Sequence, residues 1–192
     1  MGIFRNYTPK RRSITVKVSS YREHNDNLKI DYHNRCGYCG SIDTWRIVWF
    51  EIDHFVPRKY LVKISDTDYS NLVYACRSCN NAKRAHWPTK DENIHNRNDE
   101  GFIDPCDDNY NKQFSRLDNG KIKAETKLGV WMYKKLKLYK PQHEVIWNIE
   151  QLDILIEECE SLLSVISDEV LKNRMLFLYQ EYRRYTKQLG CC

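Results

Sequence analysis

The pattern of apolar and polar positions predicts a short strand near residue 50. Apolar and polar residues alternate over residues 50–55, which is the two-residue period of a strand. Pro57 cannot donate a hydrogen bond to a neighbouring strand, so we expect this strand to stop just after His54. Residues 41–63 supply the predicted strands, and the bulky apolar block expected to cover a small core consists of Trp45, Ile47, Trp49 and Phe50.

Two further elements are predicted in the middle of the chain. Residues 80–86 have the composition of a helix with an asparagine near its N-cap, and Pro88 ends it because the residue before a proline avoids the helical conformation. Asn119-Gly120 separates residues 114–117 from residues 121–124, which is typical of a β-hairpin.

From residue 126 onward, apolar residues recur at the spacing of helices. Asn148 and Gln151 have the spacing of a capping box, which predicts a helix start there. A second N-cap is predicted at residues 167–169, so the chain closes as one bent helix or as a helical hairpin. The apolar stripe before that point consists of Leu152, Leu155, Ile156, Cys159, Leu162, Leu163 and Ile166.

The N-terminal part is polar and basic. Residues 1–20 are predicted to form an arm, with one short strand at residues 14–18. Residues 21–35 tolerate a helix, and we expect His24 and His33 at the surface. The first residues lack the hydrophobic core of a signal peptide, and no apolar run approaches the roughly 20 residues of a membrane span. These patterns predict a cytoplasmic protein without a membrane contact.

Four of the eight cysteines form two Cys-x-x-Cys pairs, Cys36/Cys39 and Cys76/Cys79, which bracket the predicted strand. The two-residue spacer lets both sulfurs of a pair face one ion, and four thiolates satisfy tetrahedral Zn²⁺ at about 2.3 Å each. In a chain without an export signal, such cysteines favour metal binding over disulfides. The alternatives are two disulfides or four unrelated buried cysteines. The pairs predict two zinc knuckles around a structural Zn²⁺.

Between these pairs, Asp53 and His54 have the side chains that phosphodiester hydrolysis needs. The reaction requires a deprotonated water and neutralisation of charge on the transition state and the leaving oxygen. A histidine that titrates near neutral pH can accept the proton, and one divalent cation held by Asp53 can act as the Lewis acid. The alternative is a structural Asp-His pair in a treble-clef zinc module.

The pattern C-x-x-C, D-H, N-L and C-x-x-C-N-x-x-K over residues 36–83 resembles the zinc-stapled HNH endonucleases. This resemblance implies a ββα-metal core of two strands and a helix around one divalent cation. By position, Asp53 and Asn80 would bind the cation, His54 would be the general base, and Asn71 would support the loop and the base. An asparagine at the last position favours hard cations such as Mg²⁺ or Mn²⁺ over transition metals.

The charge distribution favours a nucleic-acid partner. The net charge of +5 suits a polyanion, and basic residues lie on both sides of the motif. The alternative for any single cluster is a solvated face. We expect DNA rather than RNA, with phosphate contacts from Arg58, Lys59, Lys83 and Arg84. Further basic clusters are Lys10-Arg11-Arg12 before the motif, and Lys134, Lys135, Lys137 and Lys140 after it.

Two weaker resemblances concern the rest of the chain. The F-x-D-P segment at residues 102–105 is similar to one that follows the core of stand-alone bacterial HNH proteins, which implies that it folds back onto the core. The C-terminal pattern is similar to nucleases of bacterial anti-phage systems of the retron and Septu type. That similarity implies an effector whose C-terminal helices form a docking platform. The many apolar positions of these helices predict contact with a second protein chain, either in a homodimer or in a complex with a partner ATPase subunit. The alternative is that they are plain core.

Together these patterns predict an α+β protein with a ββα-metal, treble-clef-like HNH core. The expected divisions are a basic arm and helix at residues 1–34, a zinc-bound nuclease core with the following loop and hairpin at residues 35–125, and a helical region at residues 126–192. The expected activity is metal-dependent endonuclease cleavage. The alternative is a zinc-finger protein that binds nucleic acid without cutting it.

Overall fold

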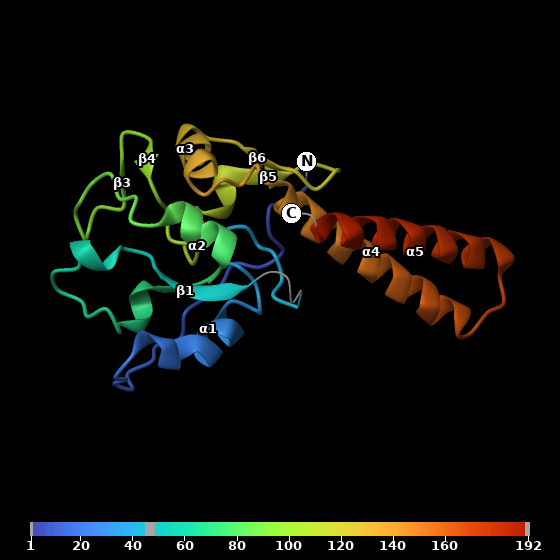
Figure 1. Cartoon of the computed structure of the whole chain (residues 1–192), viewed down its shortest axis with the longest axis horizontal. Coiled ribbons are helices and arrows are strands. Elements are labelled where there is room, and N and C mark those ends of the chain that lie inside the picture. Colours follow the sequence, from blue (N-terminus) through green and yellow to red (C-terminus); the bar gives the residue numbers. More distant parts are fainter. Residues whose placement is uncertain (1, 45–48, 191–192) are drawn as a thin grey trace. The chain divides into compact units, whose positions relative to one another are not determined.

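The computed structural model describes residues 2–44 and 49–190, and the chain divides into two compact units (Figure 1). The first unit contains residues 1–118 and 122–139, and the second contains residues 119–121 and 140–192. Small antiparallel hairpins and short helices build the first unit, and a pair of long helices builds the second, so the predicted α+β class is confirmed. Each helix that the structure describes is too short or too polar to cross a membrane.

An antiparallel strand pair followed by a helix forms the centre of the first unit. Strand β1 (Phe50–His54) pairs with β2 (Leu72–Cys76), and α2 (Arg77–Lys83) follows β2 directly. All five residues of β2 are buried, as expected for a continuous apolar strand. The ββα order and the end of β1 at His54 agree with the prediction.

The predicted bounds of this helix are wrong. Helix α2 begins at Arg77 because Cys76 has the extended backbone of an N-cap, and it ends at Lys83 because Arg84 adopts a left-handed conformation with φ of 46°. Asn80 therefore lies inside the helix and does not cap it. In the predicted apolar block, Trp45 and Ile47 lie outside the described residues. Trp49 is 68% exposed and so does not cover the core.

The segment before the strands is helical, but one of its two histidines is buried and not at the surface as predicted. A 3₁₀ turn (η1, Tyr21–His24) with a capping box leads into α1 (Asn25–Asp31). His24, expected at the surface, is buried with its ring edge-on to Tyr69 at 5.0 Å between centroids. His33 is exposed, as predicted.

The N-terminal arm is held by a β-bridge between Gly2 and Arg116 and by side-chain contacts further along. The strand predicted at residues 14–18 is wrong, because that segment is irregular. Arg11 Nε donates to Leu72 O at 2.6 Å, and its guanidinium pairs with Asp104 at 2.8 Å. The Arg11 guanidinium thus contacts groups of the protein itself. The Asp104 contact and the complete burial of Phe102 confirm that residues 102–105 fold back onto the core.

The predicted hairpin around Asn119-Gly120 is confirmed. Its strands pair from Phe114 with Ala124 to Arg116 with Ile122, and Gly120 has a φ of 85°, which few other residues adopt readily. The remaining elements of the first unit are η2 (Arg58–Tyr60), η3 (Tyr69–Asn71), β3 (Asn96–Arg97), β4 (Glu100–Gly101), η4 (Asn111–Gln113), β5 (Phe114–Arg116), β6 (Ile122–Ala124) and α3 (Lys127–Lys135).

The second unit is a helical hairpin, one of the two arrangements predicted. It consists of α4 (Pro141–Leu163) and α5 (Glu169–Leu189), and α3 packs with the first unit although the predicted helical region included it. The predicted helix start at Asn148 is wrong, because α4 starts at Pro141, and proline suits the first helical position. Asp168 caps α5 as predicted, accepting a hydrogen bond from Leu171 N at 2.9 Å.

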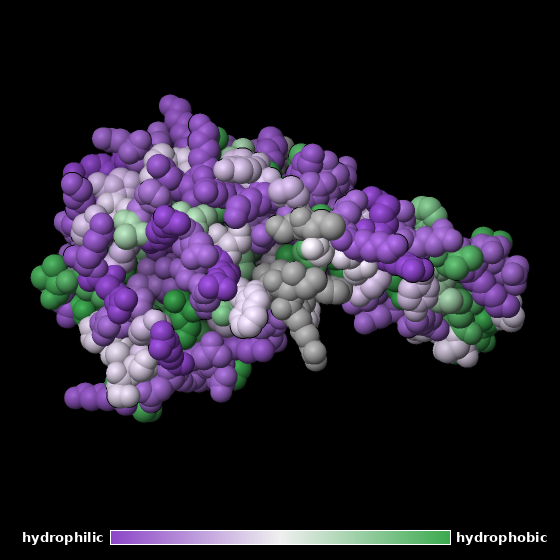
Figure 2. Space-filling view, viewed as in Figure 1, coloured by the Kyte–Doolittle hydropathy of each residue, from purple (hydrophilic) through white to green (hydrophobic). Residues whose placement is uncertain are grey.

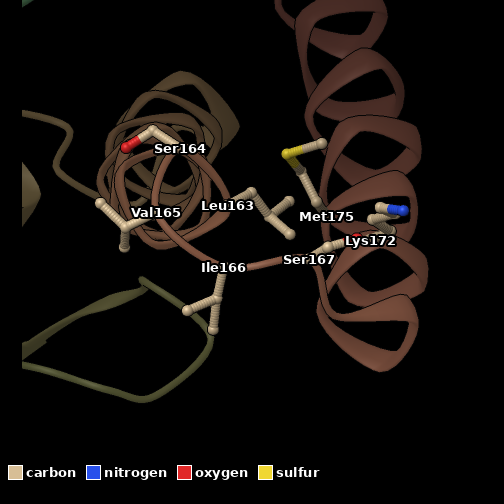
Figure 3. Close-up of a pocket in the computed structure, with 7 residues that line it drawn as sticks. All are labelled: Leu163, Ser164, Val165, Ile166, Ser167, Lys172 and Met175. Atoms are coloured by element: carbon tan, nitrogen blue, oxygen red, sulfur yellow. The ribbon is translucent and has the colours of Figure 1, made fainter.

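The hairpin buries a small apolar core of Ile156, Cys159 and Leu178. At its turn, Leu163 and Met175 point toward each other, whereas Val165 and Ile166 point away (Figure 3). The predicted role of Cys159 as a small apolar core residue is thereby confirmed, while several apolar residues of the stripe stay outside this core.

Candidate functional site

The four cysteines of the two pairs meet in a single buried cluster. Their sulfurs all lie within 4.8 Å of one another, and Cys39 Sγ is 3.8 Å from Cys76 Sγ. That separation is too long for a disulfide, whereas four sulfurs at 2.3 Å from one tetrahedral ion lie about 3.8 Å apart. The predicted knuckles therefore make one site, and its donor set fits a structural Zn²⁺.

The turn that carries Cys36 and Cys39 is fixed to the strand pair. Gly37 N donates to Tyr74 O on β2 at 2.8 Å, and Gly40 N donates to Cys36 O at 2.9 Å. A Cβ atom at Gly37 would come within 2.6 Å of the Tyr32 ring, so only glycine fits there. The C-G-Y-C segment thus holds its sulfurs toward Cys76 and Cys79.

Asp53 is the centre of a buried polar network. Its Oδ2 accepts a hydrogen bond from Tyr38 Oη at 2.5 Å and pairs with Lys83 Nζ at 2.8 Å. Burial and the nearby Asp53 carboxylate raise the pKa of Tyr38 well above its ordinary value, so the phenol stays a neutral donor. Lys83 Nζ also donates to His54 O at 2.8 Å.

This network changes the role predicted for Lys83. The side chain was expected to contact nucleic acid, but it is fully buried and its ammonium is used by Asp53 and the His54 carbonyl. Removing one partner from such a buried pair typically costs about 3–5 kcal/mol, because the other charge is left uncompensated. Lys83 therefore ties α2 to β1 through its contacts with Asp53 and with the His54 carbonyl.

Asn80 contacts a residue that the sequence patterns did not single out. Asn80 Nδ2 donates to Glu51 Oε2 at 2.7 Å, and Arg77 Nε lies 3.2 Å from Glu51 Oε1. A carboxylate only accepts hydrogen bonds, so the amide nitrogen faces Glu51 and the amide oxygen is directed elsewhere. Side chains two apart on a strand share a face, which places Glu51 and Asp53 together under α2. Asp53 and Asn80 thus have separate partners, Lys83 and Glu51.

The contacts of His54 determine which of its nitrogens can accept a proton. His54 Nε2 lies 2.7 Å from Asp66 O, and a carbonyl can only accept, so Nε2 carries the hydrogen. In the neutral ring Nδ1 is then the basic nitrogen. Burial lowers the pKa of His54, which favours this neutral form, and the Tyr21 ring lies edge-on at 4.7 Å between centroids.

Asn71 fixes the backbone that follows His54. Its backbone oxygen accepts from Phe55 N at 2.8 Å, its Oδ1 accepts from Val56 N at 2.8 Å, and its Nδ2 donates to Val56 O at 3.0 Å. These contacts are what a residue that supports the loop and the base would make.

The other three residues predicted to contact phosphates, Arg58, Lys59 and Arg84, are all exposed. Arg58 makes a long contact with Asp66, at 3.9 Å. Their charges are therefore accessible from solvent, in contrast to that of Lys83, and their part in binding nucleic acid stays a prediction.

Residues 36–86 match the sequence model of the family HNH endonuclease. The match spans both cysteine pairs, β1, β2 and α2. The chain therefore contains an HNH endonuclease domain, which implies phosphodiester hydrolase activity and a nucleic-acid substrate. Comparisons with curated proteins and with solved structures gave no match.

Replacing Cys79 with serine should remove bound zinc and most of the soluble folded protein, because the free energy of binding a structural ion becomes folding free energy. Elemental analysis and circular dichroism of the purified variant measure both effects. Cys159→Ser, in the helical hairpin, is the matched control and should keep its zinc. Native protein that carries no zinc would contradict the assignment.

Proposed function

We propose that the protein is a metal-dependent endonuclease that cuts DNA, with His54 as the general base. The observation that supports this most directly is the orientation of His54. Its Nε2 is tied to Asp66 O, so Nδ1 is left as the basic nitrogen, within a domain whose family hydrolyses phosphodiester bonds. A non-catalytic zinc finger has no need of a histidine oriented in this way.

The oxygen donors beside His54 suit a hard divalent cation. Asp53 Oδ1 is not used by the contacts to Tyr38 and Lys83, and the amide oxygen of Asn80 is directed away from Glu51. We assign these two oxygens as ligands of Mg²⁺ or Mn²⁺, which prefer oxygen. When bound, the cation would neutralise charge on the phosphate and on the leaving oxygen.

Side chains of the protein itself accept the proton, position the base and the metal ligand, and bind the substrate. His54 Nδ1 accepts the proton of the attacking water, and Asn71 keeps the backbone after His54 in place. Lys83 positions the Asp53 carboxylate through their ion pair. The exposed Arg58, Lys59 and Arg84 contact phosphates of the DNA backbone.

His54→Ala should lower the cleavage rate by roughly 10²–10⁴-fold while zinc content and fold stay unchanged, because the proton acceptor is lost. Nicking of supercoiled plasmid with Mg²⁺ or Mn²⁺ measures the effect, and single-stranded DNA and RNA test the substrate class. His33→Ala, an exposed histidine, is the control. A rate near that of the native protein would exclude His54 as the base.

Asn80→Ala should raise the Mg²⁺ or Mn²⁺ concentration needed for half-maximal cleavage, because one ligand oxygen is removed. Asn80→His should keep activity with Mn²⁺, Co²⁺ or Ni²⁺, since imidazole binds these ions better than an amide does. The control is Asn81→Ala, at the exposed neighbouring position. An unchanged metal titration for Asn80→Ala would mean that Asn80 only ties α2 to Glu51.

We also propose that the helical hairpin binds a second copy of the chain. Figure 2 shows hydrophobic side chains among hydrophilic ones over α4 and α5. Leu162 is 51% exposed, Val170 78% and Phe177 60%, which is costly unless they are covered. At helical spacing from them, the exposed Glu158 on α4 and Arg174 on α5 carry opposite charges, so α4 of one copy can complement α5 of the other.

Phe177→Glu should convert a dimer into a monomer by placing a charge in this apolar contact, and light scattering over a range of protein concentrations measures it. Leu176→Glu changes an equally exposed residue on another side of α5 and is the control. A native protein that is monomeric at every concentration would overturn the proposal. Co-purification of an ATPase subunit would instead favour the effector role expected from the anti-phage resemblance.

A further inference from the structure

A pocket of about 440 Å³ opens between η1, α1, β1 and α2. The residues before the cysteine pairs contribute Tyr21, Arg22 and Asn25 to its wall. Phe50 and Glu51 on β1 and Asn80 on α2 form much of the rest. The family match begins at residue 36, so three of the seven residues that line the pocket come from a part of the chain outside the matched domain.

The pocket adjoins the proposed catalytic residues without containing the base itself. Tyr21 lies edge-on to His54 at 4.7 Å between ring centroids. On the other side, Asn80 is the proposed metal ligand, and it donates to Glu51 at 2.7 Å. A phosphate placed for attack near His54 and Asn80 therefore has its neighbouring nucleotide at the mouth of this pocket.

The wall has the chemistry that recognises a nucleobase. Tyr21 and Phe50 are half-buried aromatic rings, and rings of this kind stack on the flat face of any base. Asn25 offers an amide, and Glu51 offers a carboxylate that accepts from an exocyclic amino group. Arg22 is exposed at the edge, where it can meet a backbone phosphate. The volume falls within the range of pockets for small ligands and exceeds that of a base alone.

We propose that this pocket binds one unpaired nucleobase of the substrate strand, next to the phosphate that is cut. The inference rests on the proposed nuclease function and specifies its substrate. A base within a duplex is stacked on its neighbours, so only an unstacked base can lay its face on Tyr21 or Phe50, and the protein would select single-stranded or locally opened nucleic acid. Because Glu51 accepts from an exocyclic amino group, which thymine and uracil lack, the pocket favours adenine, cytosine or guanine.

Phe50→Ala should weaken binding of a short single-stranded oligonucleotide by roughly 5- to 150-fold, the loss expected for one stacked base. Fluorescence anisotropy without added Mg²⁺ measures affinity in the absence of cleavage, with DNA and RNA strands as separate arms. In the native protein, an abasic site at the bound position should cause a similar loss. In Phe50→Ala the same abasic site should cause little further loss, because both changes remove one interaction.

Phe50 also stacks on Tyr74, so its removal can disturb β2. Phe50→Tyr, which keeps the ring, should therefore bind like the native protein, and Asn25→Ala tests the opposite wall. Tyr7→Ala removes an aromatic ring that is 52% exposed outside the pocket and should change nothing.

The pocket assignment is overturned if the native protein cuts nucleic acid while Phe50→Ala and Asn25→Ala bind with native affinity and keep the full abasic penalty. In that case the nuclease function still stands. A native protein that neither binds nor cuts any of the strands would overturn both proposals. Loss of affinity confined to the DNA arm or to the RNA arm supports the pocket and identifies the sugar of the substrate.

Discussion

The four-cysteine cluster is the constraint on which the rest of the first unit depends. Strands of five residues in a two-stranded pair are marginal by themselves, and the helices that the structure describes in this unit are short. The cluster joins the turn at Cys36 to Cys76 and Cys79, where β2 becomes α2. By fixing Cys76 in the N-cap conformation, it determines where α2 begins. The positions of Asn80 and Lys83 above β1 follow from that start.

The ion pair between Lys83 and Asp53 has two consequences for the site. Lys83 is fully buried, so removing these two charges from water is costly. The ion pair offsets this cost because Tyr38 and the His54 carbonyl supply further hydrogen bonds to its two charged groups. The ammonium also places a positive charge on the carboxylate that we assign to the catalytic cation. Like charges repel, so the protein alone offers a cation little net negative charge. Much of the attraction for Mg²⁺ or Mn²⁺ must then come from the substrate phosphate, which ties metal binding to substrate binding.

The features that could be predicted from the sequence depend on short-range chemistry. The cysteine spacing, the end of β1 before Pro57, the Asn119-Gly120 hairpin and the Asp168 cap each follow from a few neighbouring residues. The features that could not be predicted depend on contacts between distant segments. In the sequence, Lys83 and Arg11 look like any basic residues of the surface. Their burial follows from ion pairs with Asp53 and Asp104, which are distant in the chain. His24 is buried because Tyr69 folds over it, and Glu51 gains its role only once Asn80 lies inside α2.

Substrate choice in this protein depends on residues outside the matched segment as well as inside it. The matched segment supplies His54, Asp53 and Asn80, and also the Asp66 carbonyl that orients His54. The His54 ring is contacted as well by Tyr21, which lies outside that segment. A change near Tyr21 can therefore alter both the base pocket and the position of the histidine ring. If the catalytic cation binds together with the substrate phosphate, the position of the phosphate also determines the position of the cation. A nucleotide that does not fill the pocket would then leave both the phosphate and the cation poorly aligned. Selection of the substrate and activation of the site would then depend on the same N-terminal segment.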